Sequence, residues 1–215
     1  MKVSDILMLA LVAISFLLGW YFYPALPDQV ASHWNVHGEV DGYSSKFFAL
    51  FFIPFALVAL TIIFMLIPCI DPLKENISKF RRYYDRLVIL FFVFLIFLEL
   101  YIVYWNLGHR LAPGFLLSVG LGLLFYYIGI LCEHTKRNWF IGIRTPWTLS
   151  SDKVWEKTNK LGGILLKITG MITFAGIMFQ SMMLYFILVP FAVTVIVVVI
   201  YSYIEFKREL HERAL

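Results

Sequence analysis

The amino-acid sequence predicts an all-α, polytopic membrane protein with six transmembrane helices. Three observations lead to this fold class: 61% of the 215 residues are hydrophobic, only 15% are charged, and long uncharged segments recur along the chain. Soluble domains carry about 25% charged residues, so the polar residues here are too few to cover a protein of this size in water. The bilayer is therefore the expected solvent for most of the chain.

Six segments are long enough to cross the roughly 30 Å hydrocarbon core, which takes about 20 apolar residues in a helix. The first four are residues 6–27, 47–70, 87–108 and 111–132. The last apolar run, residues 168–204, is too long for one span. It divides at its only adjacent polar pair, Gln180-Ser181, into helices at about 161–179 and 183–205. Backbone groups cannot stay unpaired in lipid, so each segment is predicted to be helical.

The first apolar segment is expected to be a retained span, because it is longer than the 7–15-residue core of a cleaved signal peptide. The positions of Lys and Arg predict the orientation of all six. Of the 18 basic residues, all but Lys46, Arg110 and Lys167 lie at the N-terminus, in connections 71–86 and 133–160, or in the tail, 205–215. Cytoplasmic loops carry an excess of Lys and Arg. We therefore expect both termini in the cytoplasm (N-in/C-in), with loop 24–46 outside.

These observations predict a single six-helix domain, residues 1–215, in the cell membrane of a prokaryote. The basic residues fall between apolar segments rather than along one face, which argues against direct binding of nucleic acid and for contact with membrane lipid. The two cysteines lie at expected cytoplasmic helix ends, where thiols stay reduced. Function is therefore sought in the outer loop and in the long inner loop.

The outer loop contains candidate metal ligands. Asp28 is a suitable N-cap and Gly38 a suitable residue after a helix C-terminus, so we expect a short helix between them. On that helix His33 and His37 would share one face. Together with the nearby carboxylate of Asp41, the two imidazoles could bind a zinc ion.

The alternative for the same loop is a structural role. A histidine pair without the HExxH arrangement is a weak motif, and His33 and Asn35 could instead satisfy loop backbone groups. If a metal were present, it would lower the pKa of a bound water. The chain would then be a membrane-embedded, metal-dependent peptidase, with Glu39 or Glu99 as the candidate catalytic carboxylate.

Glu99 is the one carboxylate well inside a predicted span. A carboxylate in the membrane is costly and is by default a functional hypothesis. It could pair with Arg110, face a cavity that opens outward, or be a protonated group hydrogen-bonded between helices. These possibilities stay open at the level of sequence. The glycines of the fourth and fifth spans are expected to allow close helix contact.

The inner loop, residues 133–160, predicts a turn and then an interfacial helix. Thr145-Pro146 prevents a helix from passing through that point, and Ser150 or Ser151 can cap the next helix. Its tryptophans and lysines suit the headgroup layer and anionic lipid, while Arg144 could bind a carboxylate or phosphate. The candidate partner-binding residues are Asn35, Gly142, Arg144, Thr145, Pro146, Trp147 and Trp155.

Both loops resemble the SdpI family of membrane proteins. The inner loop is similar to the family's characteristic segment in Gly142-Ile-Arg-Thr-Pro-Trp-Thr-Leu149, Val154-Trp155, Thr158 and Gly162-Gly163. The outer loop resembles the short extracytoplasmic domain of unknown function that precedes many members, in Leu26-Pro27-Asp28, His33-Trp34-Asn35, Gly38, Asp41-Gly42 and Ser45-Lys46. Two departures are His37, which is outside the usual pattern, and Asn159, where the family commonly has His.

The resemblance implies an immunity protein that protects its cell from a secreted antimicrobial peptide and transduces a signal. The peptide toxin would meet the outer loop, and a cytoplasmic repressor would be held at the inner loop around residues 144–147. No cofactor is certain for this function. Two alternatives remain: the zinc-dependent peptidase, acting on a peptide substrate at the outer face, and a transporter that works through Glu99.

Overall fold

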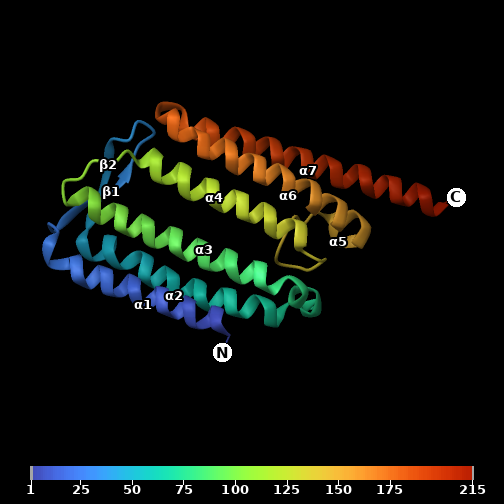
Figure 1. Cartoon of the computed structure of the whole chain (residues 1–215), viewed down its shortest axis with the longest axis horizontal. Coiled ribbons are helices and arrows are strands. Elements are labelled where there is room, and N and C mark those ends of the chain that lie inside the picture. The colour runs from blue at the N-terminus through green and yellow to red at the C-terminus, as the bar shows by residue number, and fades with distance from the viewer. Residues whose placement is uncertain (1, 215) are drawn as a thin grey trace.

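The computed structural model describes residues 2–214 and consists of long helices with one small β-hairpin (Figure 1). In this part of the chain, six helices are long and apolar enough to cross a membrane. The predicted all-α fold with six membrane helices is therefore confirmed. The helices are α1 (Val3–Phe22), α2 (Lys46–Ile70), α3 (Lys74–Asn106), α4 (Pro113–His134), α6 (Asp152–Ala175) and α7 (Met183–Ala214).

The remaining elements are short and lie in the connections. A 3₁₀ turn follows α1, and two more separate α6 from α7 at the polar pair where the sequence predicted the division. The backbone of Phe179 leaves the helical region there, at φ −129° and ψ 60°. The short elements are η1 (Tyr23–Ala25), β1 (Gln29–Trp34), β2 (Val40–Ser45), α5 (Pro146–Ser150), η2 (Gly176–Met178) and η3 (Gln180–Met182).

The helices form two groups of three, α1–α2–α3 and α4–α6–α7, which meet along α3 and α4 (Figure 1). The first group packs around a cluster of large apolar side chains in which Leu57, Ile77 and Phe92 are fully buried. In the second group, α4 and α6 pack against each other through glycines. Figure 1 shows α1–α3 below and α4, α6 and α7 above in that view.

Close contact between α4 and α6 depends on glycine. A Cβ atom on Gly129 would lie 2.5 Å from the carbonyl oxygen of Gly163, and one on Gly170 would lie 2.6 Å from that of Gly122. Real Cβ atoms do not approach backbone oxygens so closely, so no larger residue fits without moving a helix. The predicted use of these glycines for helix packing is confirmed.

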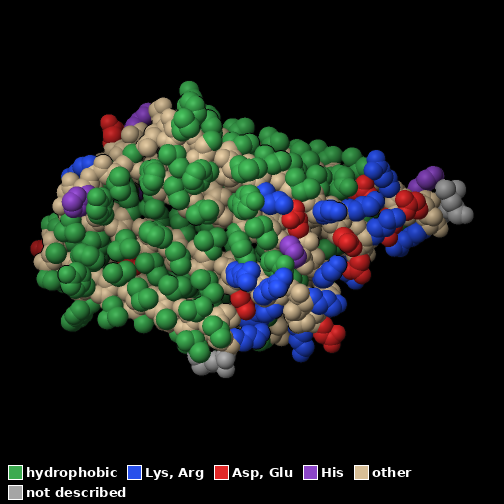
Figure 2. Space-filling model, viewed as in Figure 1, with side chains coloured by type: hydrophobic (Ala, Val, Ile, Leu, Met, Phe, Trp, Pro, Cys, Tyr) green, Lys and Arg blue, Asp and Glu red, His purple; other side chains and the backbone are tan. Residues whose placement is uncertain are grey.

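The hairpin lies at one end of the bundle, and both chain ends lie at the other, because the chain crosses the bundle six times. We call these the hairpin end and the tail end. Figure 2 shows a broad hydrophobic surface over the middle of the bundle, with Lys, Arg, Asp and Glu side chains gathered at the tail end. Much of the basic connection 71–86 is helical, because α3 already begins at Lys74, and α7 continues through most of the tail.

The predicted short helix between Asp28 and Gly38 is wrong, since this segment is an antiparallel β-hairpin of β1 and β2. Residues such as Val30 and Trp34 favour extended backbone. Gly38 does adopt the positive φ, +78°, that the helix-end prediction assigned to it, but within the hairpin turn. The sequence suggested a helix because suitable capping residues, Asp28 and Gly38, flank this segment. In the structure, pairing between β1 and β2 supplies the backbone hydrogen bonds instead.

Candidate functional site

Asn35 organises the turn of the hairpin. Its side-chain oxygen accepts hydrogen bonds from the backbone N–H groups of His37 (2.9 Å) and Glu39 (3.0 Å), and its amide donates to the Glu39 carboxylate (3.0 Å). The Gly38 N–H donates to the Asn35 carbonyl. Within the chain, the contacts of Asn35 are therefore structural, because they close the hairpin turn.

The structure places the candidate metal ligands on the hairpin but does not bring all of them together. His33 Nδ1 lies 2.5 Å from Asp41 Oδ1, and both side chains are exposed, at 71% and 43%. His37 lies in the turn rather than one helical turn after His33, because the segment is extended. Among residues 2–214, no three His, Cys, Asp or Glu side chains are grouped so that they could hold a metal ion.

A cavity of about 780 Å³ lies beneath the hairpin, between the two helix groups. Its walls come from the hairpin, the first turns of α2, the last turns of α3, the start of α4 and the start of α7. The hairpin turn reaches across it: a Cβ atom on Gly38 would lie 3.3 Å from the ring of Pro113 at the beginning of α4. The cavity is within the usual range for ligand sites, about 300–1,000 Å³.

Two residues that line this cavity each contain a buried polar atom with no partner among residues 2–214. The indole Nε1 of Trp34 and the hydroxyl of Ser44 are buried and make no hydrogen bond within the described chain. The Trp34 ring is held edge-to-face against Tyr101 and Trp105, with centroids 5.0 and 5.4 Å away. Both atoms are closed to solvent, so they lie behind the surface of the wall and do not face the cavity.

Glu99 is fully buried between α1 and α3, where Ser15 donates a hydrogen bond to Oε2. Its other oxygen, Oε1, has no hydrogen-bond partner within residues 2–214. It does not pair with Arg110, whose guanidinium lies over the ring of Trp105, 4.7 Å from the centroid. Of the possibilities left open by the sequence, the geometry matches a carboxyl group hydrogen-bonded between helices.

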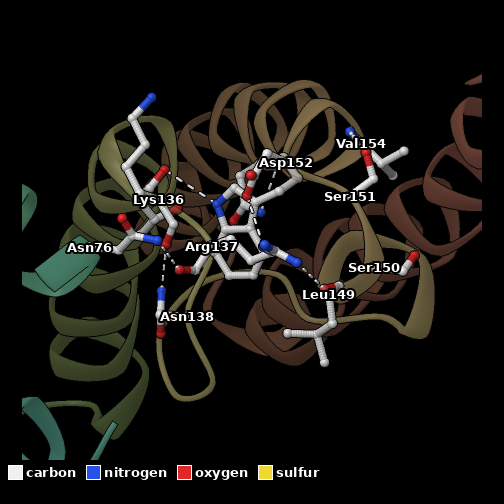
Figure 3. A network of polar contacts seen from close by, with 12 residues as sticks. Asn76, Lys136, Arg137, Asn138, Leu149, Ser150, Ser151, Asp152 and Val154 are labelled. Carbon is white, nitrogen blue, oxygen red and sulfur yellow. Dashed lines mark hydrogen bonds and ion pairs between the residues drawn. The ribbon is translucent and has the colours of Figure 1, made fainter. Parts of the chain in front are cut away.

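At the tail end, the connection from α4 to α6 is tied to its neighbours by polar contacts (Figure 3). Asn76 of α3 donates to the carbonyl of Arg137 (2.8 Å). The Arg137 side chain donates to the Leu149 carbonyl (3.0 Å) and forms an ion pair with Asp152 (2.8 Å). The carboxylate of buried Asp71, at the end of α2, accepts a hydrogen bond from the Trp139 N–H. This connection is therefore folded against both helix groups.

Asn159 and Trp155 of α6 fix the turn that precedes α5. Asn159 is 1% exposed; its oxygen accepts from the Ile143 N–H (2.8 Å), and its amide contacts the Ile143 carbonyl (3.3 Å). Trp155 is also 1% exposed and donates to the Thr135 carbonyl (3.3 Å). Gly142 has φ +107°, which suits glycine. Trp155 thus supports the turn from inside.

The outer surface of this turn contains the remaining candidates for partner binding. Arg144 is exposed and donates to the Trp139 carbonyl at 2.5 Å. Pro146 is exposed, and Trp147 is partly exposed against Tyr203 of α7, with ring centroids 5.2 Å apart. We refer to Trp139, Arg144, Pro146 and Trp147 as the tail-end surface.

Thr145 acts inside the same turn. It caps α5 by accepting from the Thr148 N–H (3.1 Å), and its hydroxyl donates to Ser202 of α7 (3.1 Å). Ser151 caps α6, as the sequence predicted. Two of the lysines expected to meet anionic lipid also pair with α7: Lys157 with Glu205 (2.6 Å) and Lys153 with Glu212.

The sequence reasoning missed four residues that shape these sites: Trp34 and Ser44 in the cavity wall, and Asn138 and Ser202 beneath the turn. Asn138 is fully buried and bonds the backbone of its own loop. A single polar residue in an apolar stretch, as at Ser202, is the signal that could have indicated it. No sequence signal places Trp34 and Ser44 in one cavity, because that depends on helix packing.

Comparison with known proteins gives two family matches. Residues 134–202 match the SdpI/YfhL protein family, and residues 10–58 match a domain of unknown function, DUF1648. The first match spans the tail-end turn, α6 and most of α7, and the second spans most of α1, the hairpin and the first half of α2.

A curated relative is the "Immunity protein SdpI" of Bacillus subtilis (strain 168), which is 24% identical over 169 residues, covering 79% of each chain. No solved structure matches the chain. The resemblance expected from the two loops is confirmed: this multi-pass protein of a prokaryotic plasma membrane has one segment that matches DUF1648, followed by one that matches the SdpI/YfhL family.

Proposed function

We propose that this protein is a membrane immunity protein, which protects the cell that contains it from an antimicrobial peptide. The observation that carries the proposal is the similarity to an immunity protein along 79% of both chains. Fold alone would not support a function. Here the two family matches contain the hairpin (residues 10–58) and the tail-end turn (residues 134–202).

The proposal assigns one step to each end of the bundle. The excess of Lys and Arg at the tail end favours a cytoplasmic position for that end, so the hairpin end would face outside and meet the peptide. The tail-end surface would then hold a cytoplasmic regulator. An exposed arginine beside exposed aromatic and proline side chains suits this, since arginine and tryptophan are enriched where proteins bind one another.

The test is survival of a sensitive strain. A Bacillus subtilis strain that lacks its own immunity protein SdpI is made to express this chain, and is exposed to the killing agent against which that relative gives immunity. We expect survival well above that of cells with an empty vector. Equal survival of the two strains, with the protein present in the membrane, would contradict the proposal.

Variants of the tail-end surface separate protection from signalling. Arg144→Ala removes the exposed guanidinium, and Lys160→Ala removes an exposed charge on α6 as a matched control. If a regulator is held at the tail-end surface, Arg144→Ala alters transcription that responds to the peptide, while Lys160→Ala does not. Protection itself is expected to persist in both variants, because the peptide meets the opposite end.

A further inference from the structure

Two arginines of α3, Arg82 and Arg86, lie at the tail end, where the helix passes into its apolar membrane segment. We propose that they form a site for the phosphate of an anionic phospholipid, beside the contact between the two helix groups. The charges around the arginines, the residues that follow them along the helix and their neighbours on α4 all support such a site. The inference does not depend on the function proposed above.

Both arginines are exposed, and within residues 2–214 neither forms an ion pair. The acids close to them are already engaged. Asp85, which lies between them in the sequence, pairs with Arg81 at 2.6 Å, and Glu133 at the end of α4 pairs with Lys167 of α6 at 2.7 Å. The two guanidinium groups therefore keep a positive charge that no carboxylate of the described chain neutralises.

One face of α3 changes from basic to apolar in the direction of the bilayer. Residues three or four apart share one face of a helix, and this face carries Arg82, Arg86, Leu90, Val93 and Phe97, which we call the arginine row. Leu90 and Val93 are partly exposed, and Phe97 is 54% exposed. A phospholipid has the same order of groups, a phosphate followed by hydrocarbon, so one lipid molecule can contact the whole row.

The spacing of the row fits the layers of a bilayer. At 1.5 Å of rise per residue, Arg82 and Arg86 are about 6 Å apart along the helix axis, and Phe97 is about 16 Å beyond Arg86. One headgroup layer is roughly 5–7 Å thick. Both guanidinium groups can therefore lie at the level of the phosphates while Phe97 lies in the hydrocarbon. Arginine also binds phosphate oxygens through two parallel hydrogen bonds.

Aromatic side chains connect the arginines to α4. The Arg82 guanidinium donates to the Tyr83 hydroxyl (2.9 Å) and lies over that ring, 4.8 Å from its centroid, which leaves its other donors available. The Tyr83 ring stacks on His134 of α4, with centroids 3.9 Å apart, and Tyr127 of α4 lies close to both arginines. A lipid held here would contact both helix groups, because α3 belongs to one and α4 to the other (Figure 1).

An acidic segment of a soluble protein is the competing occupant of the two arginines. Such a segment could pair with the guanidinium groups, but it would leave the apolar part of the row unused, since a water-soluble chain does not enter the hydrocarbon. Other basic side chains of the tail end are less suited to bind lipid phosphate, because Arg137, Lys153 and Lys157 are paired with carboxylates. The arginine row therefore favours phospholipid.

The experiment uses the full chain in phosphatidylcholine vesicles that contain a small, equal amount of one of two probes. The probes are phosphatidylglycerol and phosphatidylcholine, each with a diazirine at the same acyl-chain carbon. After illumination, mass spectrometry of the digested protein measures the labelling of each segment. We expect the ratio of phosphatidylglycerol to phosphatidylcholine labelling to be at least about threefold higher for residues 86–97 than for residues 52–70 of α2, which contain no Lys or Arg.

Paired variants separate this site from the general charge of the tail end. Arg82→Gln combined with Arg86→Gln removes both guanidinium groups, and should lower the ratio for residues 86–97 to that for residues 52–70. Lys160→Gln combined with Lys207→Gln removes two exposed charges from α6 and α7, and should leave the ratio unchanged. Thermal unfolding of both double variants should occur close to the parent temperature, because all four side chains are exposed.

The inference is overturned if the parent shows the same ratio for residues 86–97 as for residues 52–70, which would leave the arginines to an acidic protein segment. It is also overturned if the arginine double variant, with an unfolding temperature like that of the parent, keeps the parent's ratio. A lysine double variant that loses the preference to the same degree would count against the site as well, because the charge of the whole tail end would then account for the labelling.

Discussion

Asparagine side chains hold irregular segments of this protein together at the level of single residues. Asn35 closes the hairpin turn, Asn138 its own loop and Asn159 the turn before α5, in each case by bonding backbone groups of nearby residues. Such amides act as both donor and acceptor, so each replaces the strand or helix partner that an irregular backbone lacks. Asn159 thus has a structural role here.

Replacing Asn159 with Ala tests that role. The substitution leaves the partly buried Ile143 N–H without its partner, so the free energy of unfolding should fall by about 1–3 kcal/mol. Thermal unfolding of the detergent-purified protein measures the change. Lys160→Ala, at the exposed neighbour, should unfold close to the parent temperature. Equal unfolding temperatures for the two variants would show that the turn does not depend on Asn159.

Glu99 offers a second test at this scale, because it separates a packing role from a transport role. Glu99→Gln keeps an oxygen that accepts the Ser15 hydrogen bond, so we expect stability and immunity to persist. Glu99→Ala leaves that hydroxyl unpaired and should unfold more readily, by about 1–3 kcal/mol. A Glu99→Gln variant that folds but no longer protects cells would favour proton-coupled transport instead.

The elements differ in how far the sequence predicts them. The six membrane helices follow from apolar segments about as long as the bilayer is thick, and the division at Gln180-Ser181 is confirmed by the turns there. The hairpin was not predicted, because its residues are few, polar and flanked by capping residues. The two strands pair with each other, and Asn106 of α3 forms hydrogen bonds with both the N–H and the carbonyl of Ala31. These contacts join residues that are far apart in the sequence, so a local sequence pattern cannot predict them.

The contact between α4 and α6 gives a prediction for helix packing. Gly129→Ala would place a Cβ atom 2.5 Å from the Gly163 carbonyl oxygen, so the helices must separate. We expect the free energy of unfolding to fall by about 1–3 kcal/mol, as for other overpacked sites. Unfolding in increasing denaturant measures it. Ala175→Leu, which adds bulk at an exposed position of α6, is the control; if both variants behave alike, the close contact is not required.

At the scale of the whole molecule, the candidate sites lie at opposite ends of one bundle. The sequence predicted that two loops carry the function, and the structure places the cavity at one end and the tail-end surface at the other. It could not predict the cavity, which exists because α2, α3, α4 and α7 are packed side by side. Since the two helix groups border the cavity and also meet at the tail-end turn, a change in their packing can reach both ends.

The central claim of this account is that a peptide at the hairpin end changes the tail-end surface. A single reporter thiol tests it directly: Ser150→Cys, exposed beside that surface, in a Cys69→Ser background that removes the other exposed thiol. The rate of maleimide labelling is measured in inside-out vesicles that were formed with or without the killing agent enclosed, since the hairpin end faces the vesicle interior. We predict a change in rate of at least about twofold, as a shift between two packings requires. An unchanged rate in vesicles from cells that survive the agent would contradict the claim, and would make protection a function of the hairpin end alone.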